Sequence, residues 1–147
     1  MMECREYCKP TTLQEAIDAL RTAEGGVKLL AGGTDLLVNA REGHPYRELT
    51  IVDIYGLPEL CRIEELDGWI AIGAGVTHTQ IEQSALIREK AGVLADACRT
   101  VGSPQIRNHS TIGGNIANAS TAADSLAALS VLDAEVEVNR LAEVRRI

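Results

Sequence analysis

The chain has 147 residues and a formal net charge of −7, since it carries 14 Lys or Arg against 21 Asp or Glu. This length suits one compact domain or two very small ones, and a hydrophobic content of 46% is that of a folded chain. An acidic chain without basic clusters argues against a nucleic-acid partner. No apolar run reaches the roughly 18 residues that cross a bilayer, and the N-terminus contains no signal-peptide core. We therefore expect a cytoplasmic protein that does not enter a membrane.

The first 56 residues predict a small βα subdomain. Thr12-x-x-Glu15 matches a capping box, and the apolar residues after it recur at i, i+3, i+4 and i+7, which is the spacing of one helix face. Gly25-Gly26 ends this helix. The other elements are expected as an extended entry at 7–10, strands at 27–31 and 49–54, and a helical turn at 36–41.

The remaining residues, 57–147, predict a second, mixed α+β subdomain. Asp67-Gly68 is a turn signal between two alternating runs, so 63–74 is expected to form a hairpin. Thr79-x-x-Glu82 matches another capping box and predicts a helix over 79–89. The other elements are expected as helices at 94–101 and 121–132, a polar stretch at 105–110, a half-exposed strand at 134–138 and an interrupted hairpin at 139–147.

Two segments with paired glycines dominate the sequence. The first, 29–36, is Leu-Leu-Ala-Gly-Gly-Thr-Asp-Leu, and the second, 111–115, is Thr-Ile-Gly-Gly-Asn. Glycines leave backbone N–H groups open to an approaching anion, and Thr and Asn side chains add hydrogen bonds. Either segment alone is equally typical of a simple turn. Together they favour two loops that hold the two phosphates of a dinucleotide from opposite sides.

Several other kinds of site are excluded. Gly-x-x-x-x-Gly-Lys-Ser/Thr does not occur, and the nearest approach to Gly-x-Gly-x-x-Gly, at 73–78, ends in His78, so a dinucleotide pocket here is not a Rossmann pocket. The four cysteines form no Cys-x-x-Cys pair, and no histidine stands at metal-ligand spacing. We expect reduced cysteines, no metal and no catalytic side chain. His109 and Arg107 precede the second segment and could face a phosphate, although a solvated position is more typical of both.

In these segments the chain resembles the FAD-binding subunit of the molybdenum hydroxylases, the family of xanthine dehydrogenase and carbon monoxide dehydrogenase. Ala-Gly-Gly-Thr-Asp-Leu at 31–36 resembles the first flavin motif of that family, and Thr-Ile-Gly-Gly-Asn at 111–115 resembles the second. The stretches 7–16 and 105–108 are similar as well. The resemblance implies an α+β fold of two subdomains with FAD between them, of the vanillyl-alcohol oxidase and CO dehydrogenase flavoprotein type. The family's subunit is longer, so we expect its C-terminal part to be missing here.

The resemblance also implies roles for individual residues. The first segment would wrap the FAD pyrophosphate with backbone amides, and the second would complete this grip. Val101 would make an apolar contact with the cofactor, and Asp124 would accept a hydrogen bond from a ribose or ribityl hydroxyl. Asp124 also suits the first turn of a helix capped by Thr121, which replaces the family's usual proline. The cofactor-binding residues implied are Leu29, Leu30, Ala31, Gly32, Gly33, Thr34, Asp35, Leu36, Val101, Thr111, Gly113, Gly114, Asn115 and Asp124.

A relay of electrons is the function that the resemblance implies. A partner subunit would hold the molybdenum cofactor and oxidise the substrate, a further subunit with 2Fe–2S clusters would carry the electrons to FAD, and NAD or another acceptor would receive them. Two alternatives stay open. One is a truncated, non-enzymatic docking or nucleotide-binding module, and the other is a stand-alone flavin oxidoreductase.

Overall fold

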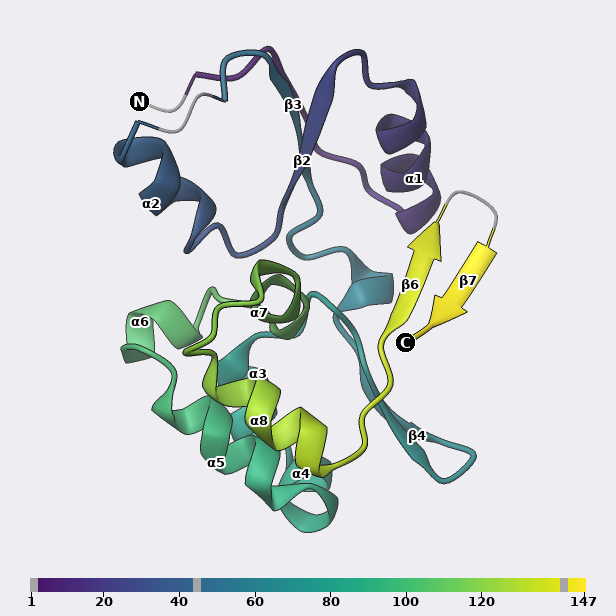
Figure 1. Ribbon diagram of the computed structural model, residues 1–147. Helices are drawn as coiled ribbons and strands as arrows, with labels where there is room; N and C mark the ends of the chain where they lie inside the picture. The colour runs from purple at the N-terminus through teal and green to yellow at the C-terminus, as the bar shows by residue number, and fades with distance from the viewer. Residues whose placement is uncertain (1–2, 44–45, 141–142) are drawn as a thin grey trace.

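The computed structural model describes residues 3–43, 46–140 and 143–147. Figure 1 shows a sheet with two helices at one end of the molecule and a group of short helices at the other. The sheet is parallel, in the order β1–β3–β2, with Glu6 opposite Thr50 and Leu30 opposite Asp53. Its elements, which confirm the expected ones, are β1 (Glu6–Cys8), α1 (Leu13–Thr22), β2 (Gly26–Leu30), α2 (Leu36–Arg41) and β3 (Leu49–Asp53).

Strand β3 is the buried centre of this sheet. Its Ile51 and Val52 are fully buried, as expected of β-branched residues in a strand that has neighbours on both sides. Val52 belongs to a small apolar cluster with Ala16 of α1 and with Leu57. Leu57 thus packs with the first subdomain although it follows residue 56, and the division into 1–56 and 57–147 stays a prediction.

Helix α1 begins as predicted, but its capping box is formed in one direction only. Thr12 Oγ1 accepts a hydrogen bond from the Glu15 amide at 3.2 Å. The Glu15 carboxylate accepts instead from the amide of Thr11 at 2.8 Å and from its hydroxyl at 2.9 Å. These bonds lower the pKa of Glu15.

The rest of the molecule combines two hairpins with short helices. In the first hairpin Ile63 lies opposite Ile72, and its turn is the predicted Asp67-Gly68, whose φ angles are 50° and 83°. The elements are η1 (Pro58–Leu60), β4 (Ile63–Leu66), β5 (Trp69–Ile72), α3 (His78–Gln83), α4 (Ala85–Lys90), α5 (Gly92–Thr100), α6 (Pro104–Arg107), α7 (Ile112–Asn118), α8 (Asp124–Val131), β6 (Glu137–Arg140) and β7 (Glu143–Arg146).

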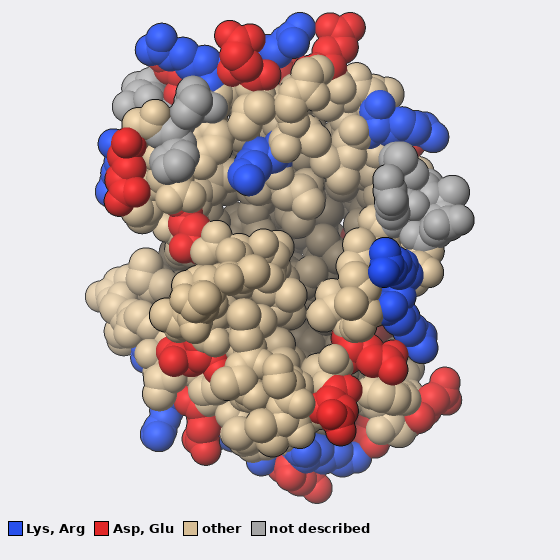
Figure 2. All heavy atoms as spheres, in the orientation of Figure 1, with Lys and Arg blue, Asp and Glu red and all other residues tan. Residues whose placement is uncertain are grey.

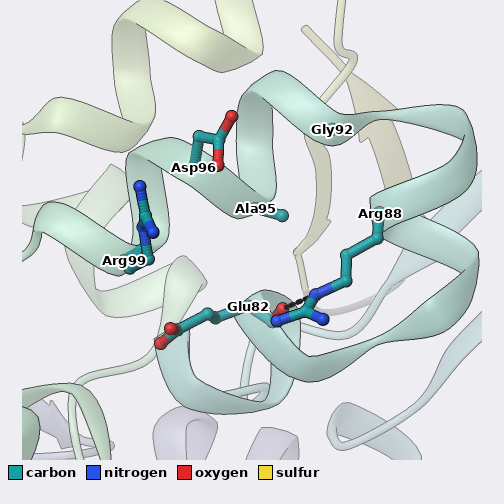
Figure 3. A pocket seen from close by; sticks show the side chains of 6 residues that line it. All are labelled: Glu82, Arg88, Gly92, Ala95, Asp96 and Arg99. Carbon is teal, nitrogen blue, oxygen red and sulfur yellow. Dashed lines mark hydrogen bonds between the residues drawn. The ribbon is translucent and has the colours of Figure 1, made fainter.

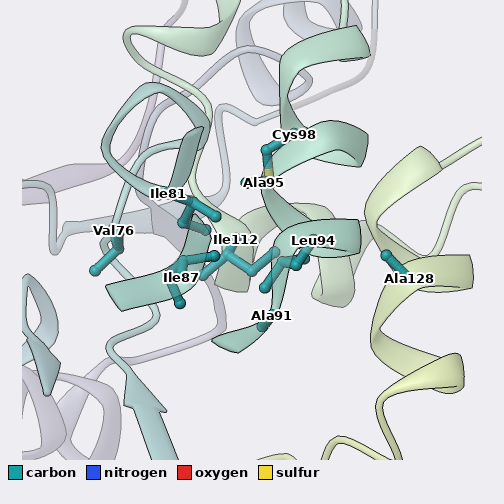
Figure 4. Packing of buried hydrophobic residues seen from close by; sticks show 9 residues of the cluster. All are labelled: Val76, Ile81, Ile87, Ala91, Leu94, Ala95, Cys98, Ile112 and Ala128. Carbon is teal, nitrogen blue, oxygen red and sulfur yellow. The ribbon is translucent and has the colours of Figure 1, made fainter. Parts of the chain in front are cut away.

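The core of this part is a cluster of buried apolar side chains, most of them from the helices (Figure 4). Burial raises the pKa of the Cys98 thiol to about 12, so Cys98 acts as a small apolar residue. The members of the cluster are Val76, Ile81, Ile87, Ala91, Leu94, Ala95, Cys98, Ile112 and Ala128.

Among the residues described, no helix combines the length and the apolarity that a membrane crossing requires.

The helix expected over 79–89 was wrong in its start and in its continuity. Thr77 caps α3 instead of Thr79: its Oγ1 accepts from the Gln80 amide at 3.2 Å, while Gln80 Oε1 accepts from the Thr77 amide at 2.8 Å. Ser84 has extended backbone geometry and caps α4, so one expected helix is two.

Three other boundaries also differ from the prediction. Ser103 caps the short helix α6, which occupies part of the polar stretch at 105–110, where no helix was predicted. Helix α8 begins at Asp124 rather than at Thr121, because 120–122 form a local turn in which Ser120 Oγ accepts from the amide two residues on. The strand expected at 134–138 is displaced to β6.

Candidate functional site

The two Gly-Gly segments are brought together by a close backbone contact. A Cβ added at Gly32 would lie 1.9 Å from the carbonyl oxygen of His109 and 3.0 Å from Cα of Ser110. No side chain fits there, because the obstacle is main chain that cannot rotate away. Ser110 directly precedes Thr111, so the first segment rests on the start of the second. We refer to the contact of Gly32 with His109 and Ser110 as the motif junction.

The first segment presents its amides without internal partners. It leaves β2, turns at Gly33, where φ is +72°, and enters α2 at Leu36. Within the described part of the chain, the N–H groups of residues 32–36 donate to no protein acceptor, and the first paired amide is that of Leu37, which donates to the Gly33 carbonyl at 2.9 Å. Consecutive N–H groups at such a turn form a concave donor surface for an anion.

The first segment is anchored on both sides of its turn, by Gly32 at the motif junction and by Leu36 at the start of α2. Leu36 is buried and holds the start of α2, while Gly32, Gly33 and Thr34 are half-buried and Asp35 is exposed. Asp35 makes no capping hydrogen bond to α2. Figure 2 shows one face of the molecule, which is hollowed between its two ends, with mostly uncharged residues around the hollow and most charged residues toward the two ends.

The second segment is the first turn of α7 and not an open loop, so the expectation of bare amides was wrong there. Thr111 is the buried N-cap of this helix. All amides from 112 to 115 are paired within the protein: Ile112 with the Val76 carbonyl at 2.9 Å, Gly113 with the Ala74 carbonyl at 3.0 Å, Gly114 with Thr111 Oγ1 at 3.2 Å and Asn115 with the Thr111 carbonyl at 3.0 Å.

Asn115 joins the second segment to α8. Its Oδ1 accepts a hydrogen bond from the fully buried Ser125 hydroxyl. Asp124 immediately precedes Ser125 and is exposed in the first turn of α8, whose N-cap is Ala123 with no side-chain capping bond. Thr121 therefore does not cap this helix, and Asp124 stands next to a side chain that touches the second segment.

Val101 is held at the end of α5 by a residue of α6. Its carbonyl accepts a hydrogen bond from Arg107 Nη1 at 3.1 Å, and Arg107 Nε lies 3.6 Å from Glu82 Oε2. The side chains of both Arg107 and Glu82 are mostly buried. Arg107 thus has protein partners, and it braces the chain that leads to His109 and the motif junction.

A polar network at the end of β3 had no signal in the sequence. The carboxylate of Asp53, which is 8% exposed, accepts from Tyr7 Oη at 2.5 Å and from the Tyr55 amide at 2.9 Å, with Lys9 Nζ at 3.4 Å. The bond to Asp53 raises the pKa of Tyr7 to about 12. Tyr55 Oη lies 3.5 Å from His109 Nδ1, so the network reaches the motif junction.

A separate hollow between α3, α4 and α5 has a mixed charge (Figure 3). Two carboxylates and two guanidinium groups line it, and Arg88 Nε donates to the Glu82 carbonyl at 2.7 Å. None of its residues belongs to either Gly-Gly segment, so we do not assign the site to it. The lining residues are Glu82, Arg88, Gly92, Ala95, Asp96 and Arg99.

Comparison with known proteins gives the family. Residues 2–147 match the family described as FAD binding domain in molybdopterin dehydrogenase. The xanthine dehydrogenase FAD-binding subunit of Escherichia coli O157:H7 is 38% identical over 146 residues, which are 99% of this chain and 49% of that protein. The nicotinate dehydrogenase FAD-subunit of Eubacterium barkeri is 38% identical over 143 residues, 97% of this chain and 48% of that protein. The chain thus spans about half the length of these relatives.

Solved structures have the same fold. Carbon monoxide dehydrogenase of Hydrogenophaga pseudoflava matches with a TM-score of 0.90 and 30% identity, over 100% of this chain and 51% of that one. Quinoline 2-oxidoreductase of Pseudomonas putida 86 matches with a TM-score of 0.92 and 26% identity, over 100% and 51%. These matches confirm the expected flavoprotein fold and the resemblance to the xanthine and CO dehydrogenase family. The chain belongs to the FAD-binding domains of the molybdopterin dehydrogenases.

Proposed function

We propose that this chain is the FAD-binding, electron-transferring part of a molybdenum hydroxylase of the xanthine dehydrogenase type. The observation that carries the proposal is the run of amides at residues 32–36, which find no acceptor among the described residues and adjoin the motif junction. The oxygens of a diphosphate accept hydrogen bonds, so they suit a row of donors. Membership of an FAD-binding family supplies the identity of the ligand that carries this diphosphate.

The residues at and near the junction would have different roles toward such a ligand. The amides of 32–36 would hold the pyrophosphate, while Leu29, Leu30 and Ala31 lead the chain from β2 to that position. Thr111 and Asn115 would contribute side-chain groups, and Gly113 and Gly114 would keep the first turn of α7 free of side chains. Val101 would supply an apolar contact, and Asp124 would accept a hydrogen bond from a cofactor hydroxyl.

The chain's own task is to bind and orient the cofactor. When bound, FAD supplies a redox centre that takes up electrons and passes them on. Electrons would arrive from 2Fe–2S clusters on a partner subunit that serves a separate molybdenum-cofactor subunit, and NAD or another acceptor would receive them. Relatives that are named FAD-binding subunits support this division of labour. No acid, base or nucleophile of this chain is required.

A competition titration tests how the cofactor is held. The purified 147-residue chain is titrated with FAD, and the quenching of flavin fluorescence gives Kd. Hydrogen bonds to charged groups contribute about 1.5–3 kcal/mol and 1.4 kcal/mol is about tenfold, so FAD should bind at least ~10 times more tightly than riboflavin, which has no phosphate. ADP should displace FAD. Equal affinities for FAD and riboflavin, without displacement by ADP, would contradict the diphosphate grip.

The visible spectrum and anaerobic NADH separate the relay from its alternatives. Bound flavin in stoichiometric amount supports the relay if a heterocycle or aldehyde substrate reduces it only when the partner subunits are also present. A chain that is colourless and does not bind added FAD would instead be a docking module. Repeated oxidation of NADH by the chain alone, with an electron acceptor supplied, would identify a stand-alone oxidoreductase. A single reduction of FAD by NADH does not, since it is the reverse of the relay's last step.

A further inference from the structure

His78 is a fully buried histidine that binds the main chain next to the motif junction. It is the first residue of α3 and is 0% exposed. Its Nδ1 lies 2.9 Å from the Ser110 carbonyl oxygen and 2.8 Å from Ser110 Oγ. A carbonyl oxygen only accepts, so this bond requires the proton on Nδ1.

The backbone reinforces the same attachment. The His78 amide also donates to the Ser110 carbonyl, at 3.1 Å, and the preceding residue, Thr77, forms an isolated antiparallel bridge with Thr111. The side chain and main chain of His78 thus converge on the one residue that separates His109 from Thr111. Gly32 packs against Cα of this same Ser110.

The other ring nitrogen of His78, Nε2, is buried and has no hydrogen-bond partner among the residues that the structure describes. Burial lowers the pKa of His78 and the positive Arg107 lowers it further, while the bond to the Ser110 backbone raises it. Burial thus favours the neutral ring, and the tautomer with the proton on Nδ1 is the one that donates to the Ser110 carbonyl.

We propose that His78 is a positioning residue for the diphosphate site, because it fixes the Ser110 main chain against which Gly32 of the first segment rests. This inference depends on the proposed function for the identity of the ligand. The hydrogen bond from Nδ1 holds the Ser110 main chain in place, and Gly32, at the start of the run of free amides, packs against this main chain. Without the bond, FAD has to order this backbone on binding. The apparent Kd then equals the intrinsic Kd divided by the fraction of free molecules in which the backbone is already ordered.

Two variants separate positioning from general stability. His78→Leu fills the volume but removes the donor, whereas His78→Asn places an amide N–H close to the position of Nδ1. Ile87→Val is the matched control, since Ile87 is fully buried in the same core and belongs to neither segment. For each full-length variant we would measure thermal melting, the FAD Kd, and amide hydrogen exchange of 29–36 and 106–118 in the flavin-free chain.

The proposal predicts a specific pattern. His78→Leu raises the FAD Kd about tenfold or more, as expected for the loss of roughly 1.4 kcal/mol, and speeds exchange in 106–118. His78→Asn restores both values, and Ile87→Val lowers the melting temperature without changing either. If His78→Leu does not fold, His78→Gln takes its place, because its amide lies one methylene too far out.

Three results would overturn the proposal. The first is a folded His78→Leu variant whose FAD Kd and hydrogen exchange equal those of the wild type. The second is a His78→Asn variant as impaired as His78→Leu. The third is an Ile87→Val variant that loses as much melting temperature as His78→Leu and weakens FAD binding equally. A wild-type chain that does not bind FAD would refute the proposed function. The exchange measurements alone would then decide whether His78 positions the junction.

Discussion

Gly32→Ala tests whether the motif junction sets the geometry of the diphosphate site. The added Cβ would lie 1.9 Å from the His109 carbonyl oxygen and 2.6 Å from its carbon. Because ordinary contact begins at 3.4 Å, the two backbones have to separate by about 1.5 Å. Such overpacking costs about 1–3 kcal/mol. FAD binding has to supply this free energy to restore the original spacing of the two segments, and 1.4 kcal/mol is about tenfold in Kd. We therefore expect FAD to bind ~10- to 100-fold more weakly.

The assay is the fluorescence titration of the purified chain, with thermal melting to show that each variant is folded. Gly92→Ala is the control, since a Cβ at Gly92 meets nothing within 4 Å and the residue lies in the first turn of α5. Its Kd should equal that of the wild type. A folded Gly32→Ala chain with wild-type affinity would refute the claim that the contact of Gly32 with His109 positions the ligand.

Three further predictions concern other residues of the site and the sheet. Gly114→Val places a Cβ 2.9 Å from Thr111 Oγ1, which caps α7, so the FAD Kd should rise about tenfold or more, and an unchanged Kd in a folded variant would exclude position 114 from the site. Asp124→Ala should weaken FAD without unfolding the chain; a melting loss that is equal with and without FAD would show a helix-stabilising role instead. The Asp53 bond raises the pKa of Tyr7 from 10.0 to about 12, so the folded state retains a proton that the unfolded state loses. The stability advantage of the wild type over Tyr7→Phe should be full below pH 10 and shrink from pH 10 to 12; an advantage that is constant up to pH 12 would contradict the bond.

Local signals were enough for several elements. The Thr12 cap, the apolar stripe of α1 and the turn at Asp67-Gly68 depend on residues that are close in sequence. Each was confirmed because no distant contact competes with it. The first Gly-Gly segment was also recognisable, since a strand followed by two glycines and a short helix needs no tertiary information.

The start of α3 was not predictable because two capping patterns overlap. Thr77-x-x-Gln80 and Thr79-x-x-Glu82 are both acceptable locally. The choice is made at long range: Thr77 bridges to Thr111, and the next amide donates to the Ser110 carbonyl. A single sequence does not contain this pairing.

The second Gly-Gly segment was misjudged for a related reason. Its glycines suggested bare amides, yet Gly113 packs against Ala74, where a Cβ would be 2.5 Å from the Ala74 Cβ. Gly113 therefore serves close packing between α7 and the chain after β5. Distinguishing that use of glycine from ligand binding requires the position of residue 74.

The central claim is that a diphosphate binds at the amides of 32–36, and a ¹H–¹⁵N NMR titration of the chain with ADP tests it most directly. We predict that the largest shift changes occur at these amides, while those of Ile112, Gly113 and Asn115 keep their hydrogen bonds and move less. Saturable binding of ADP that leaves the amides of 32–36 unmoved would contradict the account.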